Sequence, residues 1–195
     1  QIGDWIGVVA NKQDKHTADE VINLDEIKGI WCYVVMPQMR DYEKMSKRLQ
    51  KKMMRDIPDS IKQTYLIPRE YGFWLRRQWT AQSVGYVSEQ SSLEQESPVV
   101  YPQLGFFTGW HIWNGKLVIE SATPRYNADN TITITNPVKD TCIIVYLGKD
   151  SLVLSDGIES RSYYRKKNIN DVNVKARYIA DKLKKEALKK TMQQQ

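Results

Sequence analysis

The stretch Phe106–Ala122, FFTGWHIWNGKLVIESA, decides the class of fold. Two runs rich in aromatic and β-branched residues flank the dipeptide Asn114-Gly115. Asn-Gly suits the two positive φ angles of a type I′ turn, which is a common short link between antiparallel strands. The stretch therefore predicts a β-hairpin with strands over 106–113 and 116–122.

Strand signals continue on both sides of this hairpin. Residues 131–135 alternate strictly between Thr and Ile, which predicts a strand with one buried and one solvated face. Other aromatic or β-branched runs bounded by turn residues lie at 31–36, 71–81, 83–87, 141–147, 151–154 and 158–167. Short strands with no crossover helices among the later ones predict a mainly β, antiparallel barrel or sandwich.

Two segments follow a helical period instead. Between 40 and 57, apolar residues recur every three or four positions with basic residues between them, and Pro58 ends the pattern. We expect this inserted amphipathic helix to dock on the barrel, or over its mouth, through Tyr42, Met45, Leu49 and Met53; a Met-rich face that binds a protein partner is the alternative. A C-terminal basic helix is predicted over 170–195, capped by Asn170 or Asp171, with a buried stripe of Val172, Ala176, Ile179, Leu183 and Ala187.

The length of 195 residues fits a single domain over 1–195. Its expected parts are an N-terminal extension at 1–28, which ends in a helical turn at 24–27, a barrel at 29–168 with the helical insert at 40–57, and the helix at 170–195. No stretch approaches the run of about 18 apolar residues that spans a bilayer. Cys32 and Cys142 lie far apart and outside any Cys/His cluster, so we expect buried free thiols before a disulfide, and a metal role last.

The formal charge of +6 is unevenly distributed. Residues 40–57 and 171–195 each carry +4, and the rest of the chain carries −2. Acidic residues are mixed into both basic segments, as is typical of solvated helix faces. The basic character therefore does not predict a long-range steering field from the body of the protein.

Catalytic signatures are absent from the sequence. The usual hydrolase, zinc-protease and nucleotide-binding motifs do not occur. His16 lies in a polar stretch, and His111 lies on a strand between Trp110 and Ile112, where a structural role is favoured. Glu94 and Glu96 lie in a Ser/Glu/Gln loop with nothing to fix their separation. We therefore expect neither an enzyme nor a cofactor or metal site.

Aromatic residues are the real surplus, with six Trp and eleven Tyr. Such side chains fill barrel cores and line ligand cavities equally well. The candidates for a cavity are Trp74, Trp79, Trp110, Trp113, Tyr146 and Tyr163. Arg76 and Arg77, between Trp74 and Trp79, also suggest stacking and phosphate contacts with a nucleic acid, but no RNA-binding signature accompanies them.

Several segments resemble one known family. Gly109–Ile119, Lys149–Leu154 and Arg161–Lys166 resemble the C-terminal half of the lipocalin-like (calycin) domains of small exported Bacteroidetes proteins, and Leu24–Trp31 is similar to the Gly-x-Trp segment that begins their first strand. Together these cover about half of the chain. The helix at 40–57 and the C-terminal helix are both longer than the family pattern.

The resemblance implies an up-and-down barrel of about eight strands, either filled by side chains or holding one small ligand. It also implies no catalysis, and export to the periplasm or the outer membrane. Trp31 would close one end of the barrel, and we predict that Arg161 or Arg165 of the last strand lies over its ring.

The leading hypothesis is a non-catalytic, lipocalin-like barrel that binds a small apolar or amphipathic ligand. The alternative is a protein or envelope interaction module with a side-chain-filled barrel, and helix 40–57 is a possible surface for a protein partner. Nucleic-acid binding through the basic helices is the least favoured hypothesis.

Overall fold

The structure is a computed structural model that describes residues 2–39, 44–56, 67–85, 99–127, 129, 131–171, 176–179, 181, 182, 185 and 189. The chain forms two compact units, one of residues 1–33, 72–87 and 104–170 and the other of residues 34–71, 88–103 and 171–195. No helix among the described residues is both long and apolar enough to cross a membrane.

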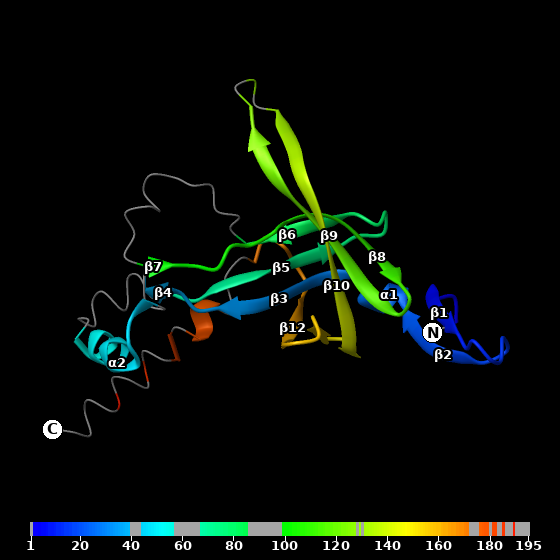
Figure 1. Cartoon of the computed structure of the whole chain (residues 1–195), viewed down its shortest axis with the longest axis horizontal. Coiled ribbons are helices and arrows are strands. Elements are labelled where there is room, and N and C mark those ends of the chain that lie inside the picture. The colour runs from blue at the N-terminus through cyan, green and yellow to red at the C-terminus, as the bar shows by residue number, and fades with distance from the viewer. Residues whose placement is uncertain are drawn as a thin grey trace. The chain divides into compact units, whose positions relative to one another are not determined.

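Eight antiparallel strands form a nearly closed barrel (Figure 1). The order around the barrel is β6-β5-β3-β12-β11-β10-β9-β8. Strands that follow one another in the chain are neighbours, the last strand β12 pairs with the first barrel strand β3, and β6 and β8 are the two edges of the sheet. Arg165 on β12 lies opposite Trp31 on β3. The predicted fold class, an up-and-down barrel with a helical insert and a C-terminal helix, is confirmed. The bounds are β3 Gly29–Val35, β5 Arg69–Leu75, β6 Ala81–Val84, β8 Phe106–Trp113, β9 Lys116–Tyr126, β10 Ile132–Leu147, β11 Ser151–Ser155 and β12 Ser160–Lys166.

The barrel closes between β6 and β8 through few contacts. Thr80 and Gly109 form an antiparallel bridge, and the Trp110 amide donates to the Trp79 carbonyl over 2.9 Å. The Ser83 hydroxyl donates to the Gly105 carbonyl and accepts from the Phe107 amide. One hydroxyl therefore replaces part of the missing backbone ladder.

The inner face of the barrel is a continuous apolar cluster to which all eight strands contribute. Because side chains alternate along a strand, the residues between these inward-facing ones lie on the outside. Ile30, Cys32 and Val84 form a smaller outer cluster, against which Trp74, Tyr164 and Ile169 pack. The buried inner residues are Ile27, Trp31, Phe73, Leu75, Ala81, Trp110, Leu117, Ile119, Leu152 and Leu154.

The hairpin predicted from Phe106–Ala122 is confirmed. Asn114 and Gly115 have φ angles of 48° and 75°, as a type I′ turn requires. The turn packs on the N-terminal segment, because a Cβ on Gly115 would overlap the carboxylate of Glu20. The strands predicted at 141–147 and 151–154 are also confirmed, and they pair as a second hairpin formed by β10 and β11.

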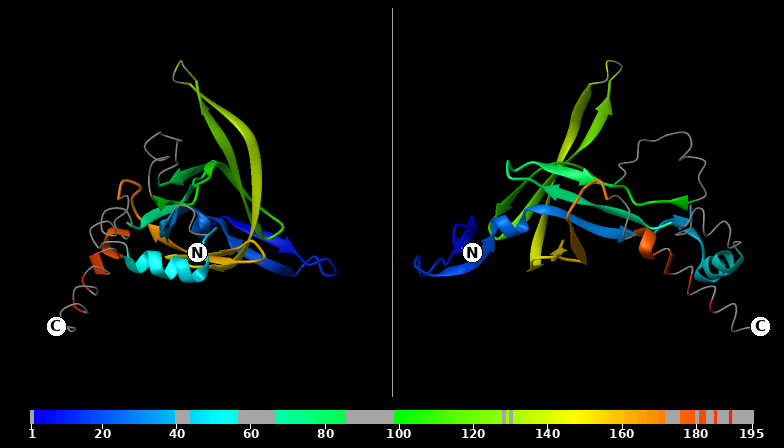
Figure 2. Two further views of the ribbon diagram at one scale, coloured as in Figure 1. Left: turned by 60° about the vertical axis from the view of Figure 1, so that its left-hand side comes forward. Right: turned by 180° about the vertical axis from the view of Figure 1, so that it is seen from behind.

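The strand predicted at 131–135 is present, but the face of it that was predicted to be buried is exposed. Ile132 and Ile134 are 49% and 52% exposed. This part of β10 pairs only with Thr123–Tyr126 of β9, and Figures 1 and 2 show the two strands running beyond the rest of the barrel. We call residues 123–126 and 132–135 the β9–β10 arm. The alternating pattern predicted the strand correctly, but nothing among the described residues covers its apolar side.

The N-terminal segment forms its own two-stranded sheet of β1 (Ile6–Ala10) and β2 (Ala18–Asn23). The predicted helical turn follows as α1 (Leu24–Ile27). Asn23 caps α1, since its side-chain oxygen accepts from the amides of Asp25 and Glu26.

The second unit holds the other short elements. β4 (Gln38–Met39) pairs with β7 (Val99–Val100), and Arg69 lies 3.6 Å over the ring of Tyr101. Within the predicted range 40–57, the described helix is α2 (Lys47–Asp56), and the Ser46 hydroxyl accepts from the Leu49 amide and so caps it.

The predicted docking stripe of α2 is wrong for Leu49, which is 49% exposed, whereas Met45 is half-buried. Tyr42 and the side chain of Met53 lie outside the described residues. Near the C-terminus, residues 176–179, 181, 182, 185 and 189 are helical. Ala176 is buried and Ile179 half-buried, as predicted, while Val172, Leu183 and Ala187 lie outside the described residues.

Candidate functional site

Trp31 marks one end of the barrel, which we call the Trp31 end. Its indole is fully buried and donates from Nε1 to the Ile27 carbonyl over 2.7 Å. The guanidinium carbon of Arg165 lies 4.1 Å from the ring centroid. Of the two predicted arginines, Arg165 therefore covers Trp31.

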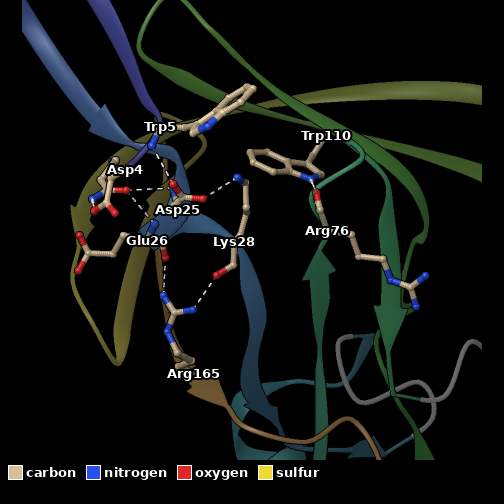
Figure 3. A network of polar contacts seen from close by, with 9 residues as sticks. Asp4, Trp5, Asp25, Glu26, Lys28, Arg76, Trp110 and Arg165 are labelled. Atoms are coloured by element: carbon tan, nitrogen blue, oxygen red, sulfur yellow. Dashed lines mark hydrogen bonds and ion pairs between the residues drawn. The ribbon is translucent and has the colours of Figure 1, made fainter. Parts of the chain in front are cut away.

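Arg165 also binds the backbone of this end from several sides. It donates to the carbonyl oxygens of Glu26, Lys28 and Lys149, the first two of which Figure 3 shows. These carbonyls belong to α1, to the residue before β3 and to the β10–β11 turn. One side chain thus joins two segments distant in sequence, residues 26–28 and the β10–β11 turn.

Asp25 organises the solvent side of the same end. Its carboxylate accepts from the Trp5 amide at 2.7 Å and from the Lys28 ammonium at 2.8 Å (Figure 3). These bonds, the one from Lys28 above all, hold the pKa of Asp25 below its usual range. Lys28 lies 5.8 Å from the ring of Trp5.

Two of the predicted tryptophans lie together near this end. Trp110 is buried in the inner cluster and donates from Nε1 to the Arg76 carbonyl at 2.9 Å (Figure 3). Trp79, on the β5–β6 turn, has a positive φ of 60° and packs on Trp110 with ring centroids 4.9 Å apart. The backbone hydrogen bond from Trp110 to Trp79 holds this conformation in place.

Farther along the inside of the barrel, four aromatic rings from four strands meet, and we call them the inner aromatic cluster: Tyr33, Phe73, Phe107 and Tyr163. The ring centroid of Tyr163 lies 5.3 Å from that of Tyr33 and 5.1 Å from that of Phe73. Phe73 and Phe107 are 5.9 Å apart, edge to face. Phe73 is buried, but the other three keep part of their surface exposed, so solvent reaches the inner face of the barrel here.

Arg161 lies at this cluster and not at Trp31. Its guanidinium carbon is 4.6 Å from the centroid of the Tyr33 ring, and it also hydrogen-bonds to the Tyr163 hydroxyl. Arg161 and Arg165 lie four residues apart on one strand face, but the pairing of Arg165 with Trp31 places Arg161 farther along the barrel. Burial raises the pKa of Tyr163 to about 12, so its phenol stays protonated well above the pH at which an ordinary tyrosine ionises.

The chemistry of this cluster is that of a binding site. Three partly exposed rings offer apolar surface, and one cation and one phenol offer hydrogen-bond donors. Cys142 and Ile144 of β10 pack on the same inner face. Burial raises the pKa of the Cys142 thiol, which disfavours the reactive thiolate. Among the described residues, no group of side chains is arranged to hold a metal ion.

The other predicted cavity residues point elsewhere. Trp74 lies in the outer cluster, with Arg76 stacked 4.0 Å over its ring. Trp113 is 71% exposed at the end of β8, and Tyr146 is 55% exposed after a bulge in β10. The structure therefore brings Trp110 and Tyr163 to the inner face and leaves the other four outside it or on a turn.

Sequence reasoning missed Tyr33, Phe73 and Phe107. Tyr33 lies two residues after Trp31, so strand alternation could have placed it on the inner face. Phe73 and Trp74 are adjacent aromatics, and only the pairing of β5 decides which one faces inward. Phe107 precedes a bulge at Phe107/Gly109, which shifts the alternation by one residue.

Both cysteines are free thiols, with Cys32 buried and Cys142 half-buried. Arg76, predicted as a possible phosphate ligand, stacks on Trp74 and donates to the Gln82 side chain. Its guanidinium is thus engaged within the protein.

Comparison of the chain with protein-family models, with curated protein sequences and with solved structures finds no match.

Proposed function

We propose that the chain is a non-catalytic, lipocalin-like barrel that binds a small amphipathic ligand at the inner aromatic cluster. The observation that carries this proposal is the partial exposure of Tyr33, Phe107 and Tyr163 on the inside of the barrel. Small-ligand sites are concave and mostly apolar, with a few polar groups that orient the ligand. The Trp31 end supports the same view, because Trp31 and Trp110 fill that part of the barrel with almost fully buried side chains.

The test uses N-phenyl-1-naphthylamine, an uncharged apolar fluorophore whose emission rises on transfer from water to an apolar site. We expect saturable binding by the full chain. Phe107→Ala should weaken this binding by roughly 2- to 10-fold, the value of one aromatic contact. Trp113→Ala, on the outer face of the same strand, is the matched control and should leave the affinity unchanged. Equal affinities for all three proteins would contradict the proposal.

A second candidate is a protein interaction module, and one observation favours it. Ile6 and Val8 of β1 and Val21 of β2 are more than half exposed, and Val8 lies directly opposite Val21. An apolar face of this kind is common at interaction sites. The double variant Val8→Ser/Val21→Ser separates the two candidates. If this double variant no longer binds the fluorophore while Phe107→Ala binds it fully, the apolar face of β1 and β2 would be favoured as the binding surface.

A further inference from the structure

The inner aromatic cluster has one polar pole, formed by Arg161 and Tyr163. The inference that follows rests on the proposed function, since it concerns the head group of the same ligand. Arg161 is exposed, and its guanidinium packs against Tyr33 on one side and contacts the Tyr163 hydroxyl. No carboxylate among the described residues lies within ion-pair distance of it. The guanidinium therefore keeps donors that no ion pair within the described part of the chain occupies.

The two groups together offer donors and little acceptor capacity. A guanidinium has five N–H donors and no acceptor. The Tyr163 oxygen accepts from Arg161, which leaves the phenol proton for an incoming acceptor. Because a phenol keeps its proton at neutral pH, the pair presents two neighbouring donors, one of them charged. Such a pair selects an oxygen acceptor, and an anionic acceptor most strongly.

Three carboxylates act on this region at longer range, and they limit how much charge it can attract. Glu159 and Asp156 both interact electrostatically with Arg161, and Asp140 does so with Cys142. Asp156 is held on the β11–β12 turn by the amides of Ile158 and Glu159, each at 2.8 Å. Recognition must therefore come from direct contact with Arg161 and Tyr163, not from the general field at this end.

We infer that Arg161 and Tyr163 hold the carboxylate of an amphipathic ligand whose apolar chain lies against Tyr33 and Phe107. Arg161 supplies the charge-assisted hydrogen bonds, and Tyr163 supplies a neutral one. A carboxylate fits a planar guanidinium better than a point cation does, so Lys at 161 would be a poor substitute.

The experiment compares two ligands with the same chain, dodecanoate and dodecanol, as competitors of N-phenyl-1-naphthylamine. We expect dodecanoate to compete at lower concentration than dodecanol. Arg161→Gln should lower the affinity for dodecanoate by roughly 10-fold or more and leave the affinity for dodecanol nearly unchanged, as the loss of a charged hydrogen bond predicts. Tyr163→Phe should lower the affinity for dodecanoate by less. Arg161→Lys should keep only part of the affinity that Arg161→Gln loses.

Arg125→Gln on the β9–β10 arm is the matched control, because Arg125 is exposed and its loss changes the net charge by the same amount. This variant should not alter the binding of either ligand. Glu159→Gln should strengthen the binding of dodecanoate slightly. Equal competition by both ligands, unaffected by Arg161→Gln, would overturn the inference and leave the proposed function standing. Failure of both ligands and of the fluorophore to bind would overturn the proposed function and the inference with it.

Discussion

Arg165 binds several backbone carbonyls at the Trp31 end of the barrel. It covers the buried Trp31 ring and donates to three carbonyls, two from residues 26–28 and one from the β10–β11 turn. A neutral side chain at this position would leave these carbonyls without their donor, which costs free energy when they are shielded from water.

Arg165→Met should therefore lower the free energy of unfolding by about 2–4 kcal/mol. Arg165→Lys should lower it nearly as much, because an ammonium cannot reach three divergent carbonyls. Urea denaturation followed by tryptophan fluorescence measures both. Arg161→Met serves as the comparison, and a loss as large as that of Arg165→Met would show that the network at the Trp31 end has no special weight.

Gly115 combines a positive φ of 75° with a close approach to Glu20, whereas Gly157 has a φ of 96° and open space around it. Gly157→Ala should cost about 1 kcal/mol, for backbone strain alone. Gly115→Ala should cost slightly more, since the new methyl group must also displace the Glu20 carboxylate, which is the flexible end of an exposed side chain. Adding Glu20→Ala to Gly115→Ala should recover the difference. Equal losses for the two glycines would show that the hairpin turn does not depend on this contact.

Tyr163 links stability to pH. Burial raises its folded-state pKa to about 12, above the usual value of 10.0, so the folded state holds the proton more tightly than the unfolded state does. Its contribution is therefore complete below pH 10 and is lost as the pH rises toward 12. Unfolding free energies measured from pH 9 to 12 should fall less steeply for Tyr163→Phe than for the parent chain. Parallel curves would contradict the assigned burial.

At the scale of elements, the β9–β10 hairpin divides into a covered and an uncovered part. Leu117 and Ile119 of β9 are buried in the inner cluster, while Ile132 and Ile134 of the arm are about half exposed. The same two strands thus carry side chains whose contributions to stability differ greatly.

Ile119→Thr should destabilise the barrel by about 2–5 kcal/mol, because it places a hydroxyl and a cavity in the core. Ile134→Thr makes the same chemical change on the arm and should cost less than about 0.5 kcal/mol. Amide hydrogen exchange gives an independent measurement, with Thr123–Tyr126 exchanging faster than Leu117–Ile119. Slow exchange throughout the arm would indicate that something covers it in solution.

The elements also show what sequence could and could not predict. Asn114-Gly115 fixed its hairpin because the turn geometry depends on those two residues alone. The Thr/Ile alternation at 131–135 predicted a strand but not its surroundings, because a period of two says which residues share a face and not what packs on that face. The prediction of the site residues was partly wrong for a related reason. Phe73 and Trp74 are equally apolar, and only strand pairing decides which of them faces the inside of the barrel. Arg161 and Arg165 share a face, and only their register against β3 separates their roles.

At the scale of the whole molecule, the two basic segments at 40–57 and 171–195 account for the positive charge, while the remaining chain is slightly negative. Binding at the inner aromatic cluster should therefore respond weakly to salt. Competition by dodecanol should be the same at low and high ionic strength, and competition by dodecanoate should weaken only modestly, since Arg161 makes a short-range contact.

Any binding of a single-stranded oligonucleotide should instead fall steeply, with a slope of about −0.7 per phosphate contacted in a plot of log affinity against log salt. Fluorescence anisotropy at several salt concentrations separates the two behaviours. Tight, salt-sensitive oligonucleotide binding that competes with dodecanol would contradict the ligand site.

The closure of β12 on β3 has a consequence for the order of folding events. Every other strand pair in the barrel is closer in the sequence, but the pairing of Cys32 with Tyr164 spans about two thirds of the chain. Contacts of this separation form late, because the entropy of closing a long loop opposes them. Cys32 is fully buried in the finished barrel, whereas Cys142, on a hairpin strand, stays half-buried. During refolding, the Cys32 thiol should therefore stay open to alkylating reagents until the last strand docks, so the time at which it becomes protected dates the pairing of β12 with β3.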